Sequence, residues 1–200
     1  MDALTVVLSA AGRGDHQALV SFIRDTQADV WRFAAHLVDP QSADDLTQET
    51  YLRAVRAAPS FAGRSSARTW LLAIAHRVCM DELRARTRRR RRDALLPWVN
   101  PAPVEPDVAG EVTAAALLAD LDLDRRTAFV LTQLIGLSYE EAAQACGCPV
   151  GTIRSRVARA RADLVQALDA DRVVTLRPVR SRRSTPDLPV APRNTLRAEG

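Results

Sequence analysis

The sequence predicts an all-α fold in which two small helical domains are joined by a proline-rich, flexible linker. Apolar residues recur at helical spacing in both halves of the chain, and no segment shows the period-two alternation that is typical of a strand. Between the halves, four prolines within ten residues leave no room for a helix, namely Pro97, Pro101, Pro103 and Pro106. We therefore predict domains over residues 15–92 and 111–170, a linker over 93–110 and a disordered basic tail over 171–200.

The first domain begins with two predicted helices. The first helix follows an Asp15 cap, and its apolar spacing predicts the core residues Leu19, Phe22, Ile23, Thr26, Val30, Phe33, Ala34 and Leu37. The second opens with a capping box of Ser42 and Asp45, and Pro59 is expected to end it by disfavouring helical geometry at Ala58. Its core stripe is predicted to be Ala43, Leu46, Thr47, Thr50, Tyr51 and Ala54.

A third helix of this domain is predicted to begin near Ser65 and Ser66 and to run into a block of arginines that ends at Arg92. Its helical spacing directs one stripe of side chains toward the core, namely Leu71, Ile74, Ala75 and Val78.

The second domain shows a helix-turn-helix pattern. Gly136 closes one helix, and Ser138 with Glu141 forms a capping box that opens the next. A turn at Gly147-Cys148-Pro149 leads into a last helix from about residue 150 to 168. This helix is predicted to bury Ile153, Val157, Ala160, Leu164 and Leu168.

Composition excludes several classes of protein. No apolar run approaches the ~20 residues that a membrane helix needs, and no basic segment followed by an apolar one marks the N-terminus for secretion. The three cysteines are too few, and odd in number, for a disulfide scaffold. A cytoplasmic protein without membrane insertion is expected.

All 28 basic residues are arginine, and they concentrate in two blocks. Residues 63–92 carry ten arginines and two acids, a net charge of +8, and residues 151–170 carry four arginines and two acids, a net charge of +2. The preceding segments, 1–62 and 93–150, have net charges of −3 and −7. The alternation of basic and acidic segments fits a protein with two partners, one of them anionic and the other not a nucleic acid.

No catalytic, cofactor or metal site is predicted. Cys146 and Cys148 stand too close for the usual metal spacing, and Cys79 has only His76 nearby in sequence, so structural thiols are the favoured interpretation. No glycine-rich phosphate loop and no paired catalytic constellation is recognisable, so we expect a protein that is not an enzyme.

The second predicted helix, residues 42–58, carries a candidate docking face opposite its core stripe. Acidic and amide groups surround one apolar side chain there, in the set Asp45, Gln48, Glu49, Leu52 and Arg56. An apolar anchor within a polar ring is typical of a protein interface. A simple solvated face is the alternative interpretation.

The third predicted helix carries a candidate nucleic-acid surface. Away from its core stripe it presents one common face, made of Trp70, Ala73, Arg77, Arg84 and Arg88, and the loop before it supplies Arg64, Ser65 and Ser66. Arginine can pair with phosphate, and an indole can stack on an unpaired base. The alternative is that the indole belongs to the core and that the arginines only form a charged helix end.

The helix-turn-helix carries a second candidate nucleic-acid surface. The outward side of its last helix shows small residues and arginines, with Thr152, Arg154, Ser155 and Arg159 best placed for base edges and Arg156 and Arg161 nearer to phosphates. Small residues let such a helix enter the major groove. A helical hairpin used only for packing is the alternative.

Three segments together resemble the extracytoplasmic-function sigma factors of the sigma-70 family. Asp44-Asp45-Leu46-Thr47-Gln48-Glu49-Thr50-Tyr51 resembles their core-binding motif, and Ser66-Ala67-Arg68-Thr69-Trp70-Leu71 is similar to the segment that reads and opens the −10 element. Cys148-Pro149-Val150-Gly151-Thr152-Ile153-Arg154-Ser155-Arg156 is similar to their −35 recognition helix. The three segments stand in the family's order and separation.

The resemblance implies a role for each surface. Core RNA polymerase would bind Asp44, Asp45, Gln48, Glu49 and Leu52. The −10 element of promoter DNA would bind Arg64, Ser65, Ser66, Trp70, Arg77, Arg84 and Arg88, although Arg77 stands where many members carry asparagine. The −35 element would bind Thr152, Arg154, Ser155, Arg156 and Arg159.

The resemblance also implies partners: core RNA polymerase, promoter DNA and an anti-sigma factor. Two other functions remain open from the sequence. A stand-alone helix-turn-helix regulator would explain residues 138–168 but not the other two surfaces, and a helical interaction protein would use the acidic face alone.

Overall fold

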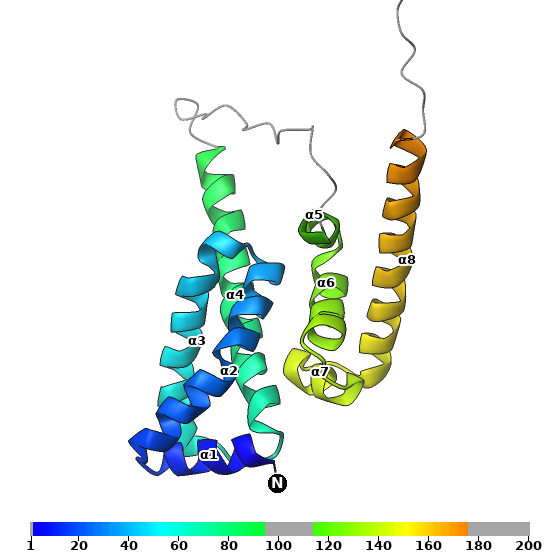
Figure 1. Cartoon of the computed structure of the whole chain (residues 1–200). Coiled ribbons are helices and arrows are strands. Elements are labelled where there is room, and N and C mark those ends of the chain that lie inside the picture. The colour runs from blue at the N-terminus through cyan, green and yellow to red at the C-terminus, as the bar shows by residue number, and fades with distance from the viewer. Residues whose placement is uncertain (1, 95–113, 176–200) are drawn as a thin grey trace, which may run out of the picture.

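The computed structural model describes residues 2–94 and 114–175, with side chains described as far as residue 169. These residues form helices and no strand, which confirms the predicted all-α fold class. Figure 1 shows α1 (Ala3–Gly12), α2 (His16–Leu37), α3 (Ala43–Ala57), α4 (Ala67–Asp93), α5 (Ala114–Ala119), α6 (Leu123–Phe129), α7 (Tyr139–Cys146) and α8 (Val150–Thr175). Three short turns, η1 (Pro40–Ser42), η2 (Ala58–Ser60) and the π-helical η3 (Val130–Leu134), connect them. Most of the predicted linker and tail, residues 95–113 and 176–200, lies outside the described residues.

Helix α1 was missed by the sequence analysis, which placed the start of the first domain at residue 15. Asp2 caps it by accepting the N–H of Thr5 at 2.8 Å, and the Leu8 side chain is buried in the core. The Thr5 hydroxyl accepts the N–H of Ala67 at 3.0 Å, which joins α1 to the start of α4. Helix α1 is therefore an integral part of the fold.

The predicted caps of α2 and α7 are confirmed, and α4 begins near its predicted start with Ser66 as its cap. Asp15 accepts the N–H of Ala18 at 3.0 Å, and Ser66 accepts the N–H of Thr69 at 3.1 Å. Ser138 and Glu141 form the reciprocal capping box of α7. Each cap satisfies an N–H group that would have no partner inside its own helix.

Helix α3 spans nearly the predicted residues, but its predicted cap and its predicted geometry at Ala58 are wrong. Ser42 makes no capping hydrogen bond, because its hydroxyl instead accepts a hydrogen bond from the Arg86 guanidinium of α4. Asp39, one turn earlier, accepts the N–H of Ser42 at 2.7 Å. Ala58 keeps helical dihedrals although Pro59 follows it, so the chain passes directly from α3 into η2.

The core stripes follow the predicted spacing with local exceptions. Phe22, Val30 and Phe33 are buried, whereas Leu19, Ile23 and Thr47 are half-buried. At the far end of α8 the prediction is wrong, since Leu164 is half-buried and Leu168 is 48% exposed. Helix α8 also continues to Thr175, past the predicted start of the tail.

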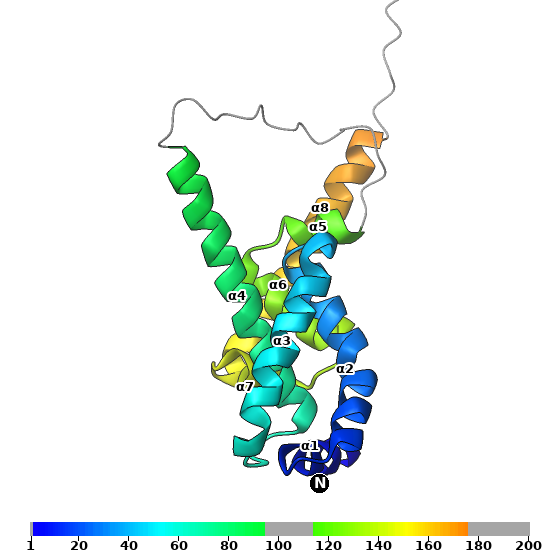
Figure 2. The ribbon, with the colours of Figure 1, turned by 90° about the vertical axis from the view of Figure 1, so that its left-hand side faces the viewer.

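The two predicted domains pack against each other and share one continuous hydrophobic core. This core contains residues of α2, α3 and α4 together with residues of α6, η3, α7 and α8. Helix α7 lies along α4, and α2 contacts α5, α6 and η3. In Figure 2 the C-terminal ends of α4 and α8 diverge as they project from this packed body. The seam between the two domains therefore covers part of the surface of α4.

Candidate functional site

The predicted docking face lies beside an apolar groove between α2 and α3. The groove has a volume of about 550 Å³ and is lined by Ile23, Gln27, Thr47, Gln48, Tyr51, Leu52, Val55 and Arg56. Leu52 is 54% exposed and Val55 is 41% exposed. Exposed apolar side chains beside polar groups are typical of a surface that binds a protein.

The acidic residues of this face differ in their surroundings. Asp44 and Asp45 are exposed, and Asp44 accepts a hydrogen bond from the indole N–H of Trp31 at 2.8 Å. Glu49 is half-buried and accepts a hydrogen bond from Arg53 at 2.7 Å, while the same guanidinium donates to Asp81 of α4 at 2.9 Å. Glu49 thus helps to position the arginine that joins α3 to α4, and Asp44, Asp45, Gln48 and Leu52 are the exposed members of the face.

Helix α4 presents the predicted arginines but only half-exposes its indole. Arg77, Arg84 and Arg88 are exposed, as is Arg64 in the preceding loop. Trp70 packs against Phe61 with ring centroids 5.3 Å apart and an interplanar angle of 56°.

The remaining residues predicted for this surface, Ser65, Ser66 and Ala73, are half-buried. The Trp70 side chain is half-buried: it packs against the core and keeps part of its surface exposed, so it lies between the two interpretations offered by the sequence.

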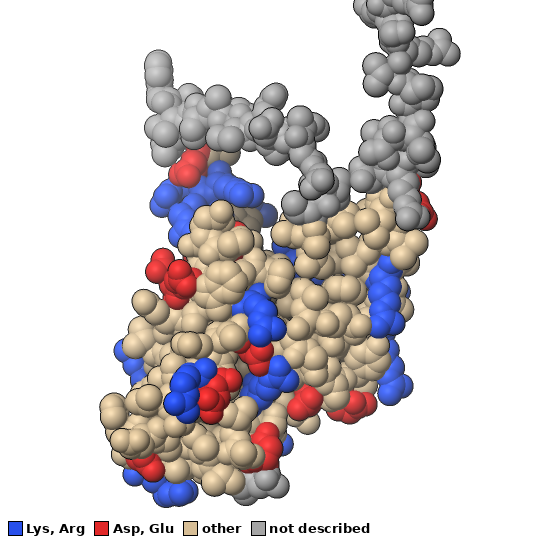
Figure 3. All heavy atoms as spheres, in the orientation of Figure 1, with Lys and Arg blue, Asp and Glu red and all other residues tan. Residues whose placement is uncertain are grey.

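Helix α8 presents an exposed basic side, although one of its arginines is bonded inside the domain. Figure 3 shows basic side chains along the outer side of α8 and at the C-terminal end of α4. Arg154, Ser155 and Arg159 are exposed, and Thr152 is half-buried.

Arg156 is the internal exception, since it is bonded within its own domain. Its guanidinium donates to Asp124 of α6 and approaches the Cys148 sulfur at 3.8 Å. Arg154 and Arg159 are exposed on this face, and the Arg154 guanidinium lies 3.8 Å from the Glu140 carboxylate of α7.

Comparison with known families and proteins covers both domains. Residues 22–89 match the model of Sigma-70 region 2, and residues 113–164 match that of Sigma-70 region 4. The chain is 52% identical over 176 residues to the ECF RNA polymerase sigma factor SigC of Mycobacterium tuberculosis, covering 85% of this chain and 94% of that protein. The chain belongs to the ECF sigma factors of the sigma-70 family.

Two solved structures share its fold. CnrH, in complex with the cytosolic domain of CnrY, superposes with a TM-score of 0.65 at 25% identity, covering 85% of this chain and 99% of that one. RpoE of Bartonella quintana, in complex with the anti-sigma factor NepR, superposes with a TM-score of 0.63 at 30% identity, covering 76% and 97%.

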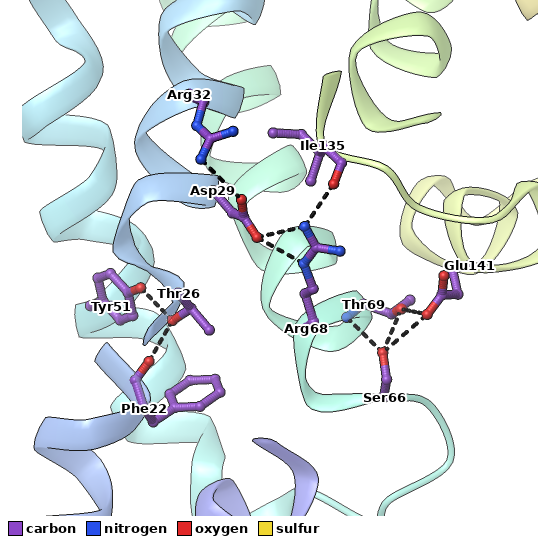
Figure 4. Close-up of polar contacts among 10 residues, drawn as sticks. All are labelled: Phe22, Thr26, Asp29, Arg32, Tyr51, Ser66, Arg68, Thr69, Ile135 and Glu141. Carbon is purple, nitrogen blue, oxygen red and sulfur yellow. Dashed lines mark hydrogen bonds and ion pairs between the residues drawn. The ribbon is translucent and has the colours of Figure 1, made fainter. Parts of the chain in front are cut away.

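The seam between region 2 and region 4 of this sigma factor holds polar contacts that the sequence analysis missed (Figure 4). Arg68 of α4 donates to the Asp29 carboxylate at 2.8 Å and to the Ile135 carbonyl oxygen, in region 4, at 2.6 Å. The hydroxyls of Ser66 and Thr69 lie 3.4 and 3.3 Å from the Glu141 carboxylate of α7. Region 4 therefore covers the first turn of α4, where the predicted −10 surface begins.

The residues that make these contacts lie within motifs already described in the sequence. Arg68 and Thr69 lie in the segment that resembles the −10 reader, and Glu141 lies in the capping box. Their partners are 67 to 75 residues away along the chain. No local pattern could have paired them.

The histidine and cysteines near the seam are buried or half-buried rather than reactive. Burial raises the pKa of the Cys79 and Cys146 thiols to about 12, so both remain protonated near neutral pH. Burial also lowers the pKa of His76, whose ring meets Phe33 edge-on with centroids 6.4 Å apart. These groups pack the interior of the sigma factor.

Metal-ligand clusters and membrane-spanning helices are both absent from residues 2–94 and 114–175. In these ranges no three His, Cys, Asp or Glu side chains gather as metal ligands would. No helix in the same ranges has the length and apolar character required to span a bilayer.

Proposed function

We propose that this ECF sigma factor directs promoter-specific initiation by docking on core RNA polymerase through α2 and α3 and by holding promoter DNA on α4 and α8. The observation that carries the proposal is the division of surfaces within one chain. An apolar groove with an acidic rim lies on α2 and α3, whereas exposed arginines occupy separate faces of α4 and α8. A protein that must bridge a polymerase and two DNA elements needs surfaces of both kinds.

The docking proposal assigns Leu52 as the apolar anchor. Asp44, Asp45 and Gln48 are exposed around it and would meet a basic partner surface. Glu49 would contribute partly through its bond to Arg53, which fixes the orientation of α3.

The −10 proposal assigns α4 and the loop before it to a single-stranded element. Arg64, Arg77, Arg84 and Arg88 would neutralise phosphates, and Trp70 would stack on an unpaired base. Ser65 and Ser66 would contact the strand at the first turn of the helix. Binding energy released in these contacts would offset the few kcal/mol that unstacking each base costs.

The −35 proposal assigns α8 to the major groove of duplex DNA. Arg154 and Arg159 would bond base edges, with Thr152 and Ser155 beside them, while Arg156 would mainly support the domain through Asp124.

Arg154→Ala and Arg159→Ala are each expected to weaken binding to a −35 duplex by about 1–3 kcal/mol, because a bidentate contact to a base is lost. Both side chains are exposed, so the fold should keep its thermal stability. Fluorescence anisotropy with matched and mismatched duplexes would measure the change. Arg161→Ala is the control on the same helix: Arg161 is predicted to lie near phosphates, so its loss should weaken binding to matched and mismatched duplexes alike and leave the discrimination unchanged. Unchanged discrimination by both variants would place the reading face elsewhere on α8.

Run-off transcription with purified core RNA polymerase tests the proposed function directly. Transcripts that begin at defined sites, and only when this protein is added, would support it. The stand-alone helix-turn-helix regulator would bind duplex DNA without conferring initiation, and an interaction protein would bind neither DNA element. Neither alternative is favoured, because the matched relatives are sigma factors over both regions.

We further propose that an anti-sigma factor holds this protein inactive, as the complex of the similar sigma factor RpoE with the anti-sigma factor NepR suggests. The protein would carry no catalytic residues of its own and would act in the cytoplasm, on the polymerase whose catalysis it directs.

A further inference from the structure

Trp31 and the hollow around it have no role in the function proposed above. The hollow lies between α2 and α3, has a volume of about 760 Å³, and is lined mainly by Gln27, Trp31, Arg32, Asp44, Thr47 and Gln48. Three of these residues, Gln27, Thr47 and Gln48, also line the groove beside Leu52. The two depressions therefore adjoin, and a partner docked on Leu52 can extend over the second one, which we call the Trp31 hollow.

Trp31 is an exposed aromatic side chain that an acidic side chain holds in place. It is 39% exposed on α2, and its indole N–H donates to the Asp44 carboxylate of α3 at 2.8 Å. This hydrogen bond spans the hollow from one helix to the other. An indole fixed in this way has little conformational freedom left to lose when a partner binds, which favours its use as a contact residue.

The Thr47 hydroxyl lies where the two depressions meet and is left without a partner. Its Oγ1 atom is buried and has no hydrogen bond within residues 2–94 and 114–175. A buried hydroxyl without a hydrogen bond is costly, and proteins keep few of them. The neighbouring Gln27 and Gln48 side chains are exposed and can turn aside for an entering group. The hydroxyl could then accept a hydrogen bond from a donor on the partner.

The charges around the Trp31 hollow favour a cation. Asp44 and Asp45 are exposed in the first turn of α3, and their two negative charges outweigh the half positive charge of the helix N-terminus. Arg32, the cation in the lining, pairs with Asp29 at 3.8 Å. The hollow therefore offers a carboxylate, an aromatic ring and an unused hydroxyl to a positively charged donor.

We propose that the Trp31 hollow binds an arginine side chain of the docked core RNA polymerase, with the guanidinium against the Trp31 indole and beside the Asp44 carboxylate, donating to the Thr47 hydroxyl. The inference rests on the proposed function and adds a second contact to its docking face. A guanidinium fits this set of groups because it is planar, carries five N–H donors and is attracted to an indole ring. Leu52 would supply the apolar anchor, and Trp31 would recognise the charge.

Trp31→Leu in the full chain tests the aromatic contact. Leucine keeps an apolar side chain but removes the ring that attracts a cation, so binding to purified core RNA polymerase should weaken about five- to thirtyfold. Anisotropy of the labelled sigma factor, titrated with core enzyme, would measure the change. Wild-type affinity of Trp31→Leu would overturn the proposal.

Trp31→Phe separates the ring from its hydrogen bond to Asp44. Phenylalanine keeps an aromatic face without the N–H donor, so this variant should lose less than about threefold in affinity. If Trp31→Phe lost as much affinity as Trp31→Leu, Trp31 would act only by orienting Asp44, and the proposed contact with a cation would be wrong.

Thr47→Val tests the hydrogen bond to the hydroxyl. Valine has nearly the shape of threonine, and because it removes a buried polar group without a partner, the melting temperature should stay the same or rise. Binding to core enzyme should nevertheless weaken about three- to thirtyfold, since the guanidinium loses an acceptor. Thr47→Ser is the matched control, because it keeps the hydroxyl and should bind as the wild type does. Unchanged affinity of Thr47→Val would overturn the proposed hydrogen bond.

A surface control and the wild type separate this inference from the proposed function. Val20→Ala should bind core enzyme normally, since Val20 is 52% exposed on α2 but lines neither depression. Circular dichroism melting would establish that every variant folds. If the wild type binds core enzyme and supports run-off initiation while the Trp31 and Thr47 variants match it, the inference is wrong and the function stands. If the wild type does neither, the proposed function itself fails.

Discussion

Leu52→Arg is expected to weaken association with core RNA polymerase by about 2–4 kcal/mol, which is roughly 30- to 1,000-fold in Kd. Leu52 is 54% exposed beside the groove between α2 and α3 and is the apolar centre of the docking face. Arginine at this position would remove the apolar anchor and add a positive charge to a face whose expected partner is basic. Surface exposure means that the substitution should leave the fold intact.

Affinity for purified core enzyme, measured by anisotropy of the labelled sigma factor, would test this expectation. Val6→Arg provides the control, because Val6 is also 54% exposed but lies on α1, outside the groove. Both variants should melt near the wild-type temperature. Normal association of Leu52→Arg would exclude this groove as the docking site.

Phe33→Ala is expected to destabilise the protein by about 3–5 kcal/mol, the usual cost of removing a buried phenyl ring. Phe33 is 0% exposed in α2, and its ring meets His76 of α4. Small domains are stable by only about 5–15 kcal/mol, so this loss would be a large share of the total free energy of unfolding. Loss of region 2 would also end promoter-specific transcription.

Urea unfolding followed by circular dichroism would measure this loss. Val6→Ala is the matched control, since its side chain is largely exposed and should change the free energy of unfolding by no more than about 0.5 kcal/mol. A Phe33→Ala variant within that range of the wild type would show that the ring does not support the core as the structure indicates.

Local signals in the sequence predicted the helices well, because each depends on residues three or four positions apart. The Asp15 cap, the start of α4 near Ser66 and the capping box of Ser138 and Glu141 are confirmed. The Ser42 cap failed because Arg86, 44 residues away, takes up its hydroxyl. A contact at that separation leaves no mark in a local pattern.

In the candidate surfaces, too, features set by neighbouring residues were predicted, and contacts between distant residues were not. Helical periodicity correctly separated the exposed Leu52, Arg154 and Arg159 from the buried stripes of their helices. The bond between Glu49 and Arg53 joins residues four apart on one helix and could have been predicted, whereas the bond between Arg156 and Asp124, 32 residues apart, could not. The structure shows where these residues lie but not what they bind, so their assigned roles stay predictions.

The continuous core shared by region 2 and region 4 has a thermal consequence. Parting the regions would expose apolar surface to water, and hydrophobic stabilisation weakens on cooling. The closed arrangement should therefore loosen in the cold, and a pair of fluorescent dyes on α1 and α8 would report lower energy transfer as temperature falls. The DNA-binding surfaces of the two regions would then be most accessible to promoter DNA below the optimal growth temperature. At those temperatures the polymerase itself opens DNA least readily.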